Sequence, residues 1–309
     1  MISRAIEDTE LNEHIASLPH DGREVFLIAD KSVRVSVVSA TRMVNQMRAN
    51  HGTGLIETYV LGQGYIAGAL LSSTVKGNDR IRLDIECGGP IGGMSIEAWA
   101  SGAVRGYLRH NPIPLEKPIE SLDTSLLYGP GFLTVTKILE GSRSPFSGQI
   151  MLEHGNLAND LAVYFQESEQ TPSLFYLSIR FDRKGRVWGA GGLFIQALPG
   201  CKDEVLDRLQ AASSSFADLG KALSEGISAS EYAENEFRAF SPEHIAHIPT
   251  GFSCPCSRDH FEGYLKALPK NEKEAILNGN FPLVLECFNC ATAYSFSKEE
   301  TENLFREDL

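Results

Sequence analysis

The sequence predicts an α+β protein in three parts: a large N-terminal domain of mixed sheet and helix over residues 1–199, a helical linker over 200–250, and a small C-terminal module over 251–309. Three observations carry this prediction. Strand-like and helix-like segments are mixed up to Pro199, the segment after Gly200 is rich in Ala, Ser and Glu, and four of the six cysteines lie near the C-terminus. With 309 residues and 42% apolar content, the chain is long enough to bury a sizeable core.

The start of the first part predicts a strand pair followed by two helices. The run REVFLIADKSVRVSVVSA, from Arg23, contains two β-rich segments separated by a charged turn, which is typical of paired strands. The residues that follow space their apolar side chains as helices do, with a break at Gly52 and Gly54 and a stop at Gly77. Small residues in the second helix predict close packing against a sheet: Gly62, Gly64, Ala67 and Gly68.

The remainder of the first part predicts strands around one more helix. Strand-like runs bounded by Gly, Pro or Asn turns read RIRLDIEC, MSIEAWA, AVRGYLRH and GFLTVTKIL. Residues 156–168 predict an amphipathic helix, because Asn156 suits an N-cap and one face carries Leu157, Leu161, Tyr164 and Phe165. Two more strands, SLFYLSIRF and RVWGAGGLFIQAL, close the domain.

The linker predicts short helices that bury little. It carries nine acidic and four basic side chains between Cys201 and Thr250, and its apolar residues are sparse. Such helices are marginal when isolated, so we expect this segment to depend on its neighbours for stability. The plain alternative, which composition favours, is an ordinary solvated linker.

The charge and the apolar pattern of the sequence limit the kinds of partner that we expect for this protein. The formal net charge is -12, and residues 254–309 carry ten acidic against six basic side chains, so we expect no nucleic-acid partner. The first nine residues lack the apolar stretch of an export signal. The most apolar long stretch, Leu55–Val75, is interrupted by Glu57, Gln63 and three glycines, so we expect no membrane association and a cytoplasmic location.

Four cysteines form the strongest candidate site. One residue lies between Cys254 and Cys256, two residues lie between Cys287 and Cys290, and about thirty residues separate the two pairs. In a reducing compartment such pairs more often bind metal or act in redox chemistry than form structural disulfides. We call each cysteine pair, carried on a tight turn, a knuckle, and two such knuckles supply the four sulfurs of one tetrahedral Zn²⁺ per chain. Four sulfur ligands close the coordination shell and leave no open position for catalysis. Four unrelated buried cysteines are the alternative, but nearby apolar residues are too few to bury them.

Other candidates are weaker. His244, His247 and His260 lack a matching ligand pair, so we interpret them as solvated or structural, and Cys87 and Cys201 stand alone as inert thiols. The run GQGYIAG loosely matches a dinucleotide loop, but it falls inside a predicted helix without a preceding strand. The sequence offers no persuasive nucleophile–base–acid arrangement.

Taken in order along about residues 23–300, several motifs resemble the heat shock protein 33 family, the redox-regulated 33 kDa chaperonins. These motifs are STVKG (73–77), GGPIGGM (88–94), AVRGY (103–107), YFQESEQTPS (164–173), AGGLFIQALPG (190–200) and the cysteine pattern C-x-C then C-x-x-C. The pattern departs from the family at Ala291, where a glycine is usual, and the stretch before Arg23 looks longer than usual.

The resemblance implies a holdase that needs no ATP and is not an enzyme. It implies that Zn²⁺ on the four cysteines keeps the reduced form inactive, and that oxidants such as peroxide or hypochlorous acid form the disulfides Cys254–Cys256 and Cys287–Cys290. The linker over 201–250 then corresponds to a metastable segment, and the activated protein is a homodimer that captures unfolding proteins.

Disulfide connectivity decides what oxidation does. Local pairing closes two tiny rings, each worth roughly 1.5 to 2 kcal/mol, and loses the cross-link over the thirty-residue gap. Crossed pairing, for instance Cys254 with Cys287, keeps the knuckles tied together. Two other functions stay open: a thiol oxidoreductase that uses Cys287 and Cys290, and a zinc ribbon that binds nucleic acid.

Overall fold

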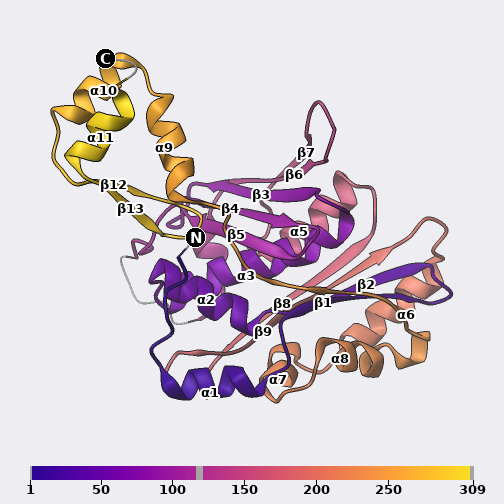
Figure 1. Cartoon of the computed structure of the whole chain (residues 1–309). Coiled ribbons are helices and arrows are strands. Elements are labelled where there is room, and N and C mark those ends of the chain that lie inside the picture. The colour runs from indigo at the N-terminus through magenta and orange to yellow at the C-terminus, as the bar shows by residue number, and fades with distance from the viewer. Residues whose placement is uncertain (1, 116–120, 307–309) are drawn as a thin grey trace.

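Helix α3 (Leu55–Leu71) lies at the centre of the fold, between two β-sheets (Figure 1). It is apolar around its whole circumference, and almost every residue from Glu57 to Leu71 is buried, as expected for a helix covered on all sides. The computed structural model describes residues 2–115 and 121–306. Residues 1 and 307–309, the outer ends of the predicted N-terminal domain and C-terminal module, lie outside the described residues.

The first sheet has five antiparallel strands in the order β10-β1-β2-β9-β8. The strand pair predicted after Arg23 is confirmed. The strands predicted for SLFYLSIRF and RVWGAGGLFIQAL are confirmed as well. The strands are β1 (Gly22–Ile28), β2 (Val33–Ser39), β8 (Ser173–Phe181), β9 (Val187–Ala197) and β10 (Glu243–Pro249).

Within the described residues, the second sheet has six strands in the order β11-β5-β4-β3-β6-β7, and only β11 is parallel to its neighbour. Its inner strands match the strand-like runs of the sequence. The strands are β3 (Arg80–Cys87), β4 (Gly93–Trp99), β5 (Ala103–Leu108), β6 (Gly131–Ile138), β7 (Phe146–Met151) and β11 (Gly251–Phe252). Three short helices lie between the larger elements: η1 (Ser72–Thr74) before β3, α4 (Ser125–Tyr128) between β5 and β6, and η2 (Arg238–Phe240) before β10.

Three helices fill the space between the sheets: α2 (Thr41–His51), α3 and α5 (Leu157–Glu167). Glycine permits the close approach that the sequence predicts for α3. A Cβ on Gly64 would lie 2.9 Å from the Met94 sulfur, and one on Gly68 would lie 2.8 Å from Ile96. Gly52, with φ of 62°, ends α2 in the left-handed conformation and so produces the predicted break.

The other face of the first sheet is covered by the helices of the linker (Figure 1). These are α6 (Asp203–Ser213), α7 (Leu219–Ser224) and α8 (Ala229–Glu236). Leu209, Leu219, Leu223, Tyr232 and Phe237 from the linker pack on buried side chains of the sheet. The sheet contributes Phe26, Ile28, Val33, Val35, Val37, Leu193 and Ile195 to this contact.

The C-terminal module projects from the core as a separate head of short elements (Figure 1). It contains α9 (Arg258–Lys266), α10 (Lys270–Leu277), the hairpin β12 (Leu283–Glu286) and β13 (Ala293–Phe296), and α11 (Lys298–Phe305). The two predicted helices and the predicted strand before Cys287 are confirmed.

Some elements differ from the sequence-based prediction. The sequence predicts short helices up to residue 250, but β10 pairs instead with β1 at the edge of the first sheet. The isolated sequence EHIAHIP has no clear strand pattern, so this pairing depends on the edge that β1 offers. Helix α1 (Thr9–Ser17), β7, β13 and α11 are also absent from the prediction. Among the described residues, no helix is long and apolar enough to cross a membrane.

Candidate metal centre

The first cysteine knuckle follows directly from a strand of the core. Gly251 and Phe252 pair in parallel with Ala103 and Val104 of β5, and the next amide, that of Ser253, donates to the Val104 carbonyl at 2.9 Å. The chain therefore enters the C-x-C motif from a fixed edge of the second sheet. Ser257 ends the knuckle by capping α9, since its hydroxyl accepts from the His260 amide at 3.2 Å.

The second knuckle is the tip of the β12–β13 hairpin. Glu286 pairs with Ala293, and the amide of Cys287 donates to the Thr292 carbonyl at 3.0 Å. The amides of Cys290 and Ala291 both donate back to the Cys287 carbonyl, at 3.2 and 2.7 Å. These bonds fold the C-x-x-C motif into a tight turn whose two sulfurs face the first knuckle.

The four sulfurs converge as the spacing predicts. All lie within 4.8 Å of one another, and all four cysteines are buried. The Sγ atoms of Cys254 and Cys287 are 3.8 Å apart, and those of Cys256 and Cys290 are 3.3 Å apart. A tetrahedral shell with metal–sulfur bonds of about 2.3 Å needs sulfurs about 3.8 Å apart. The cluster is therefore of the right size and chemistry to hold one metal ion.

Arg105 of β5 joins the core to this cluster. Its Nη1 donates to the Cys254 sulfur at 3.4 Å, its Nε donates to Glu97 at 2.7 Å, and its guanidinium lies 5.3 Å from the centre of the Trp99 ring. A tetrathiolate around a divalent ion has two net negative charges, so one guanidinium at the cluster offsets part of that charge.

Two side chains of the hairpin support the sulfurs from the other side. The Tyr294 hydroxyl lies 3.3 Å from the Cys256 sulfur and donates to the Cys256 carbonyl at 3.1 Å. The Thr292 hydroxyl lies 3.2 Å from the Cys290 sulfur. Such outer contacts orient ligands and are part of a metal site's design.

The thiols share their protons unequally. Hydrogen bonds from Cys287 and Cys290, and then from Arg105, hold the pKa of Cys254 far below its usual range. Because Cys287 and Cys290 donate to Cys254, the pKa of Cys287 is raised strongly and that of Cys290 rises to about 11. A divalent cation would remove this difference, since it deprotonates every thiol that coordinates it.

The weaker candidates lie elsewhere. His244 and His247 both contact Glu24, at 2.7 and 2.6 Å, and His260 lies against Tyr264. Within residues 2–115 and 121–306, no second group of His, Cys, Asp or Glu comes close enough to hold a metal ion. The run GQGYIAG lies inside α3, as the sequence predicts.

The spacing of residues in the sequence does not reveal which side chains support the four cysteines. Arg105 belongs to the motif AVRGY, which marks it as part of the family pattern without indicating its contact with Cys254. Tyr294 and Thr292 follow the last cysteine closely, and this proximity is the only sequence signal that they carry. Asn50, whose side chain donates to the Cys290 carbonyl at 3.1 Å, lies 240 positions away and carries no signal at all.

The fold and the cluster together define a two-sheet α+β protein with an appended four-cysteine module. The family model described as Hsp33 protein matches residues 21–297. The 33 kDa chaperonin of Ruminiclostridium cellulolyticum is 32% identical over 285 residues, which cover 91% of this chain and 96% of that protein. The 33 kDa chaperonin of Bacillus subtilis is also 32% identical, over 90% of this chain and 96% of its own.

Solved structures agree with the sequence relatives. The crystal structure of the 33 kDa chaperonin, a heat shock protein 33 homolog, from Thermotoga maritima superposes with a TM-score of 0.82 and 28% identity. The match covers 94% of this chain and 99% of that one. The chain therefore belongs to the heat shock protein 33 family, and the chaperone class expected from the motifs is confirmed.

Proposed function

We propose that this chaperone is a redox-regulated holdase that acts without ATP and is inactive while reduced. One Zn²⁺ per chain, held by Cys254, Cys256, Cys287 and Cys290, keeps the C-terminal module folded. The observation that carries the proposal is that these four buried sulfurs converge at the point where the module leaves the core. The protein then has a core over 1–199, a linker over 200–250 and a switch module over 251–309.

Oxidation removes the metal by consuming its ligands. In each knuckle two thiolates lose two electrons and form one disulfide, while one molecule of a two-electron oxidant such as peroxide or hypochlorous acid is reduced. Two oxidant molecules therefore convert the cluster to Cys254–Cys256 and Cys287–Cys290, and the Zn²⁺ ion leaves. A disulfide sulfur is a poor ligand, so the metal does not rebind until the cysteines are reduced.

Local pairing is the connectivity that opens the module. Two sulfur contacts cross between the knuckles, from Cys254 to Cys287 at 3.8 Å and from Cys256 to Cys290 at 3.3 Å. The folded cluster therefore does not by itself dictate local disulfides, and crossed disulfides would retain the link over the thirty-residue gap. Mapping the disulfides of the oxidised protein by peptide mass spectrometry distinguishes the two outcomes.

The route from the module to the linker is short. Cys254 follows β11, which follows β10, and β10 is the point at which the chain leaves the linker helices. β11 pairs with β5 through two residues only, so an unfolded module leaves little to hold it in place. Loss of β11 and then β10 frees one end of α6–α8, which supports the proposal that the linker is metastable.

Release of the linker exposes an apolar surface suited to unfolding proteins. The face of the first sheet under α6–α8 is lined by buried valines, isoleucines and phenylalanines. Uncovering such a surface is unfavourable in water, so it binds apolar segments of client proteins or a second activated copy. We therefore propose that clients are unfolding proteins and that the activated form is a homodimer in the cytoplasm.

An aggregation assay tests the function. A thermally unfolding enzyme is incubated with this protein in the reduced or the oxidised state, while a chromogenic zinc chelator follows metal release. We expect suppression of light scattering near stoichiometric amounts only after oxidation, in step with loss of one Zn²⁺ per chain. Equal protection by the reduced, zinc-loaded protein would show the redox switch to be wrong.

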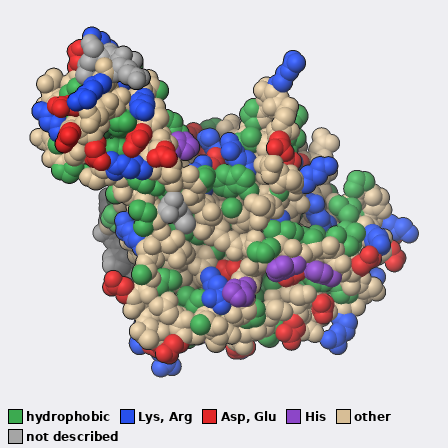
Figure 2. Space-filling model, viewed as in Figure 1, with side chains coloured by type: hydrophobic (Ala, Val, Ile, Leu, Met, Phe, Trp, Pro, Cys, Tyr) green, Lys and Arg blue, Asp and Glu red, His purple; other side chains and the backbone are tan. Residues whose placement is uncertain are grey.

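The two alternative functions make different predictions. A thiol oxidoreductase reduces insulin catalytically, whereas a holdase does not. A nucleic-acid-binding module retains single-stranded RNA at moderate salt, but Figure 2 shows acidic and basic side chains interspersed over the head instead of a continuous basic patch. The acidic excess of residues 254–309 points the same way.

A further inference from the structure

The N-terminal segment, residues 2–18, lies outside the part of the chain that the family model matches. It is nevertheless held at both ends. In Figure 1 the described part of this segment starts at the base of the C-terminal head and runs down the core past α2 to α1 below the first sheet. One short segment therefore spans the switch module and the core.

The upper end of this segment binds the second cysteine knuckle. The amide of Ile2 donates to the Thr292 hydroxyl at 3.3 Å, and Nη2 of Arg4 donates to the Ala291 carbonyl at 3.2 Å. Ala291 has φ of 50°, a conformation that favours glycine. Arg4 therefore holds the knuckle at its least favourable backbone position.

Asn50 of α2 connects the segment, the knuckle and the core. It is fully buried, and its Nδ2 donates to the carbonyls of Cys290 at 3.1 Å and Ile2 at 3.0 Å. Its Oδ1 accepts from the Arg4 amide at 3.1 Å and from Gln46 Nε2 at 2.8 Å. Both donors and both acceptor positions of the Asn50 side-chain amide are therefore occupied. This one side chain links the N-terminal segment, the second knuckle and α2 in a single hydrogen-bond network.

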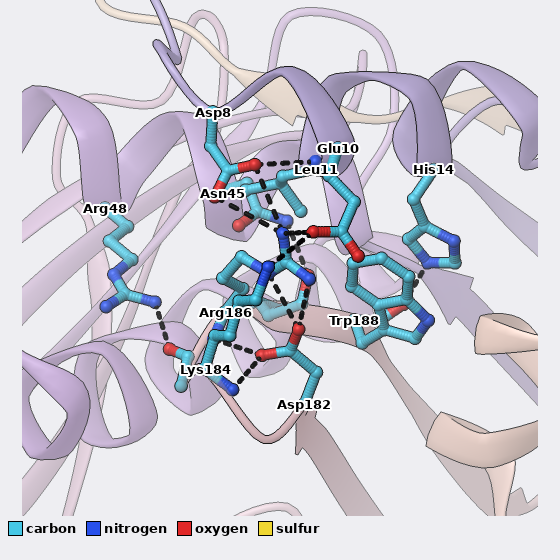
Figure 3. A network of polar contacts seen from close by, with 12 residues as sticks. Asp8, Glu10, Leu11, His14, Asn45, Arg48, Asp182, Lys184, Arg186 and Trp188 are labelled. Atoms are coloured by element: carbon cyan, nitrogen blue, oxygen red, sulfur yellow. Dashed lines mark hydrogen bonds and ion pairs between the residues drawn. The ribbon is translucent and has the colours of Figure 1, made fainter.

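The lower end is anchored by charge and by stacking (Figure 3). Arg186, directly before β9, donates to Asp8 at 3.2 Å and to Glu10 at 2.8 Å, and its Nε donates to Asp182 at 2.7 Å. Hydrogen bonds from Arg186 and then Lys184 lower the pKa of Glu10 to about 2.

A stacked ring pair and apolar contacts complete the anchor. The His14 ring lies parallel to that of Trp188, with centroids 3.6 Å apart, and its Nε2 lies 2.7 Å from the Trp188 carbonyl. Leu11 and Ile15 of α1 are buried against the core. The two ends therefore differ, because residues 2–4 at the upper end are exposed and held by hydrogen bonds, whereas the lower end is packed.

We infer that residues 2–18 form a strap whose upper end, residues 2–4 together with Asn50, clasps the second cysteine knuckle to the core and slows its opening. Asn50 and Arg4 are positioning residues, since they hold the backbone of Cys290 and Ala291 and do not touch a sulfur. The inference rests on the proposed function for its role in the redox switch, but the clasp itself exists in the reduced protein.

Hydrogen–deuterium exchange of the reduced, Zn²⁺-loaded full chain tests the clasp. We compare wild type, Arg4→Ala and a deletion of residues 2–4 with Arg143→Ala, a matched loss of an exposed arginine on the distant β6–β7 turn. We expect amides of residues 287–296 to exchange roughly 3- to 10-fold faster in the two strap variants, as loss of an ordinary hydrogen bond predicts. Amides of α3 should keep their wild-type rates in all variants.

Conservative and buried variants separate positioning from general destabilisation. Arg4→Lys keeps a cationic donor and should restore slow exchange, whereas Asn50→Asp, which keeps the acceptor but loses both donors, should resemble the deletion. Peroxide-driven zinc release should be faster by a similar factor in Arg4→Ala and unchanged in Arg143→Ala. Wild-type exchange of 287–296 in both Arg4→Ala and the deletion would overturn the inference, whatever the aggregation assay shows about the function.

Discussion

Individual residues at the cysteine cluster combine a local turn with contacts from distant strands. Cys290 is fully buried, and its neighbours Ala291 and Thr292 are bound by both the knuckle and the N-terminal strap. Arg105 approaches from the core and contacts Cys254. Changes at single positions here therefore affect metal retention before they affect the core.

Cys290→Ser removes one sulfur from the cluster. Structural zinc supplies roughly 10 to 16 kcal/mol of apparent folding free energy in small modules, so we expect the variant to lose its metal and to suppress aggregation without oxidant. Metal analysis and the aggregation assay measure this. Cys201→Ser, outside the cluster, is the control and should behave as wild type; full zinc occupancy in Cys290→Ser would contradict the ligand assignment.

Ala291→Gly relieves the left-handed conformation of the knuckle. A non-glycine residue with φ near 50° is unfavourable by roughly 1 to 2 kcal/mol, of which the greater flexibility of unfolded glycine cancels part. We expect a net stabilisation of the module of about 1 kcal/mol, seen as slower zinc release to a chelator. Faster release from the glycine variant would show that the alanine side chain has a packing role.

Asp21 gives the core a pH dependence of its own. Burial raises the pKa of Asp21 to about 6, although its carboxylate accepts from the Met43 amide at the start of α2 at 2.8 Å. Because the folded protein holds this proton more tightly than the unfolded chain does, the stability from this group is complete below about pH 4. It is lost as the pH rises through 6.

Asp21→Asn keeps the acceptor and removes the charge. We therefore expect the variant to gain stability relative to wild type between pH 4 and 6, up to about 3 kcal/mol, with a constant difference above that range. Urea unfolding at several pH values measures the difference. Asp207→Asn, at an exposed position of α6, should show no such trend, and a flat difference for Asp21→Asn would contradict the buried, protonated carboxyl.

At the scale of elements, α7 is packed so closely on the first sheet that glycine is required on both sides. A Cβ on Gly189 of β9 would clash with the carbonyl oxygen of Gly220 and approach the Ser224 backbone, and a Cβ on Gly220 would meet the Ser178 hydroxyl. Backbone atoms cannot move aside as a flexible side chain can. The linker helices therefore depend on a contact that one methyl group disrupts.

Gly189→Ala should loosen the linker without oxidation. Overpacking typically costs 1 to 3 kcal/mol, so we expect faster proteolysis within 203–236 and binding of an apolar dye by the reduced protein. Gly263→Ala, on α9 with open space around it, is the matched control and should leave both measurements unchanged. If Gly189→Ala stayed as resistant as wild type, α7 would not limit the release of the linker.

The sequence predicts the inner elements better than the edges. The strands around α3 and the helix itself follow from apolar periodicity, which is a local property. The edge strands β7 and β10 do not: FSGQIM and EHIAHIP lack strong strand patterns and become strands because β6 and β1 offer unpaired edges. Short elements of the module, β13 and α11, likewise depend on the hairpin and the cluster that fix them.

At the scale of the whole molecule, the metal centre, the strap and the linker form one connected system. The module contacts the core through β11, Arg105 and Asn50. Each of these contacts involves a cysteine of the cluster or a residue close to one in the sequence. Opening the cluster therefore affects all three contacts together.

Removing the metal while the cysteines stay reduced should separate the role of zinc from that of the disulfides. With a strong chelator and a reductant present, we expect the module and the linker over 201–250 to become protease-sensitive while the core stays resistant. Re-addition of Zn²⁺ should restore protection, because no disulfide has formed. A linker that stays protected without metal would show that disulfides, and not metal loss, release it.

The sequence by itself determined the class of site and most of the core. The spacings C-x-C and C-x-x-C specify two turns that present sulfurs, and apolar periodicity specifies α3 and its surrounding strands, because both signals act over a few residues. Only the tertiary structure decided that Arg105 meets Cys254, that β10 leaves the linker for the edge of a sheet, and that Asn50 joins residues 2–4 to Cys290. Those contacts join surfaces far apart in the chain, and no local pattern encodes which distant surfaces come together.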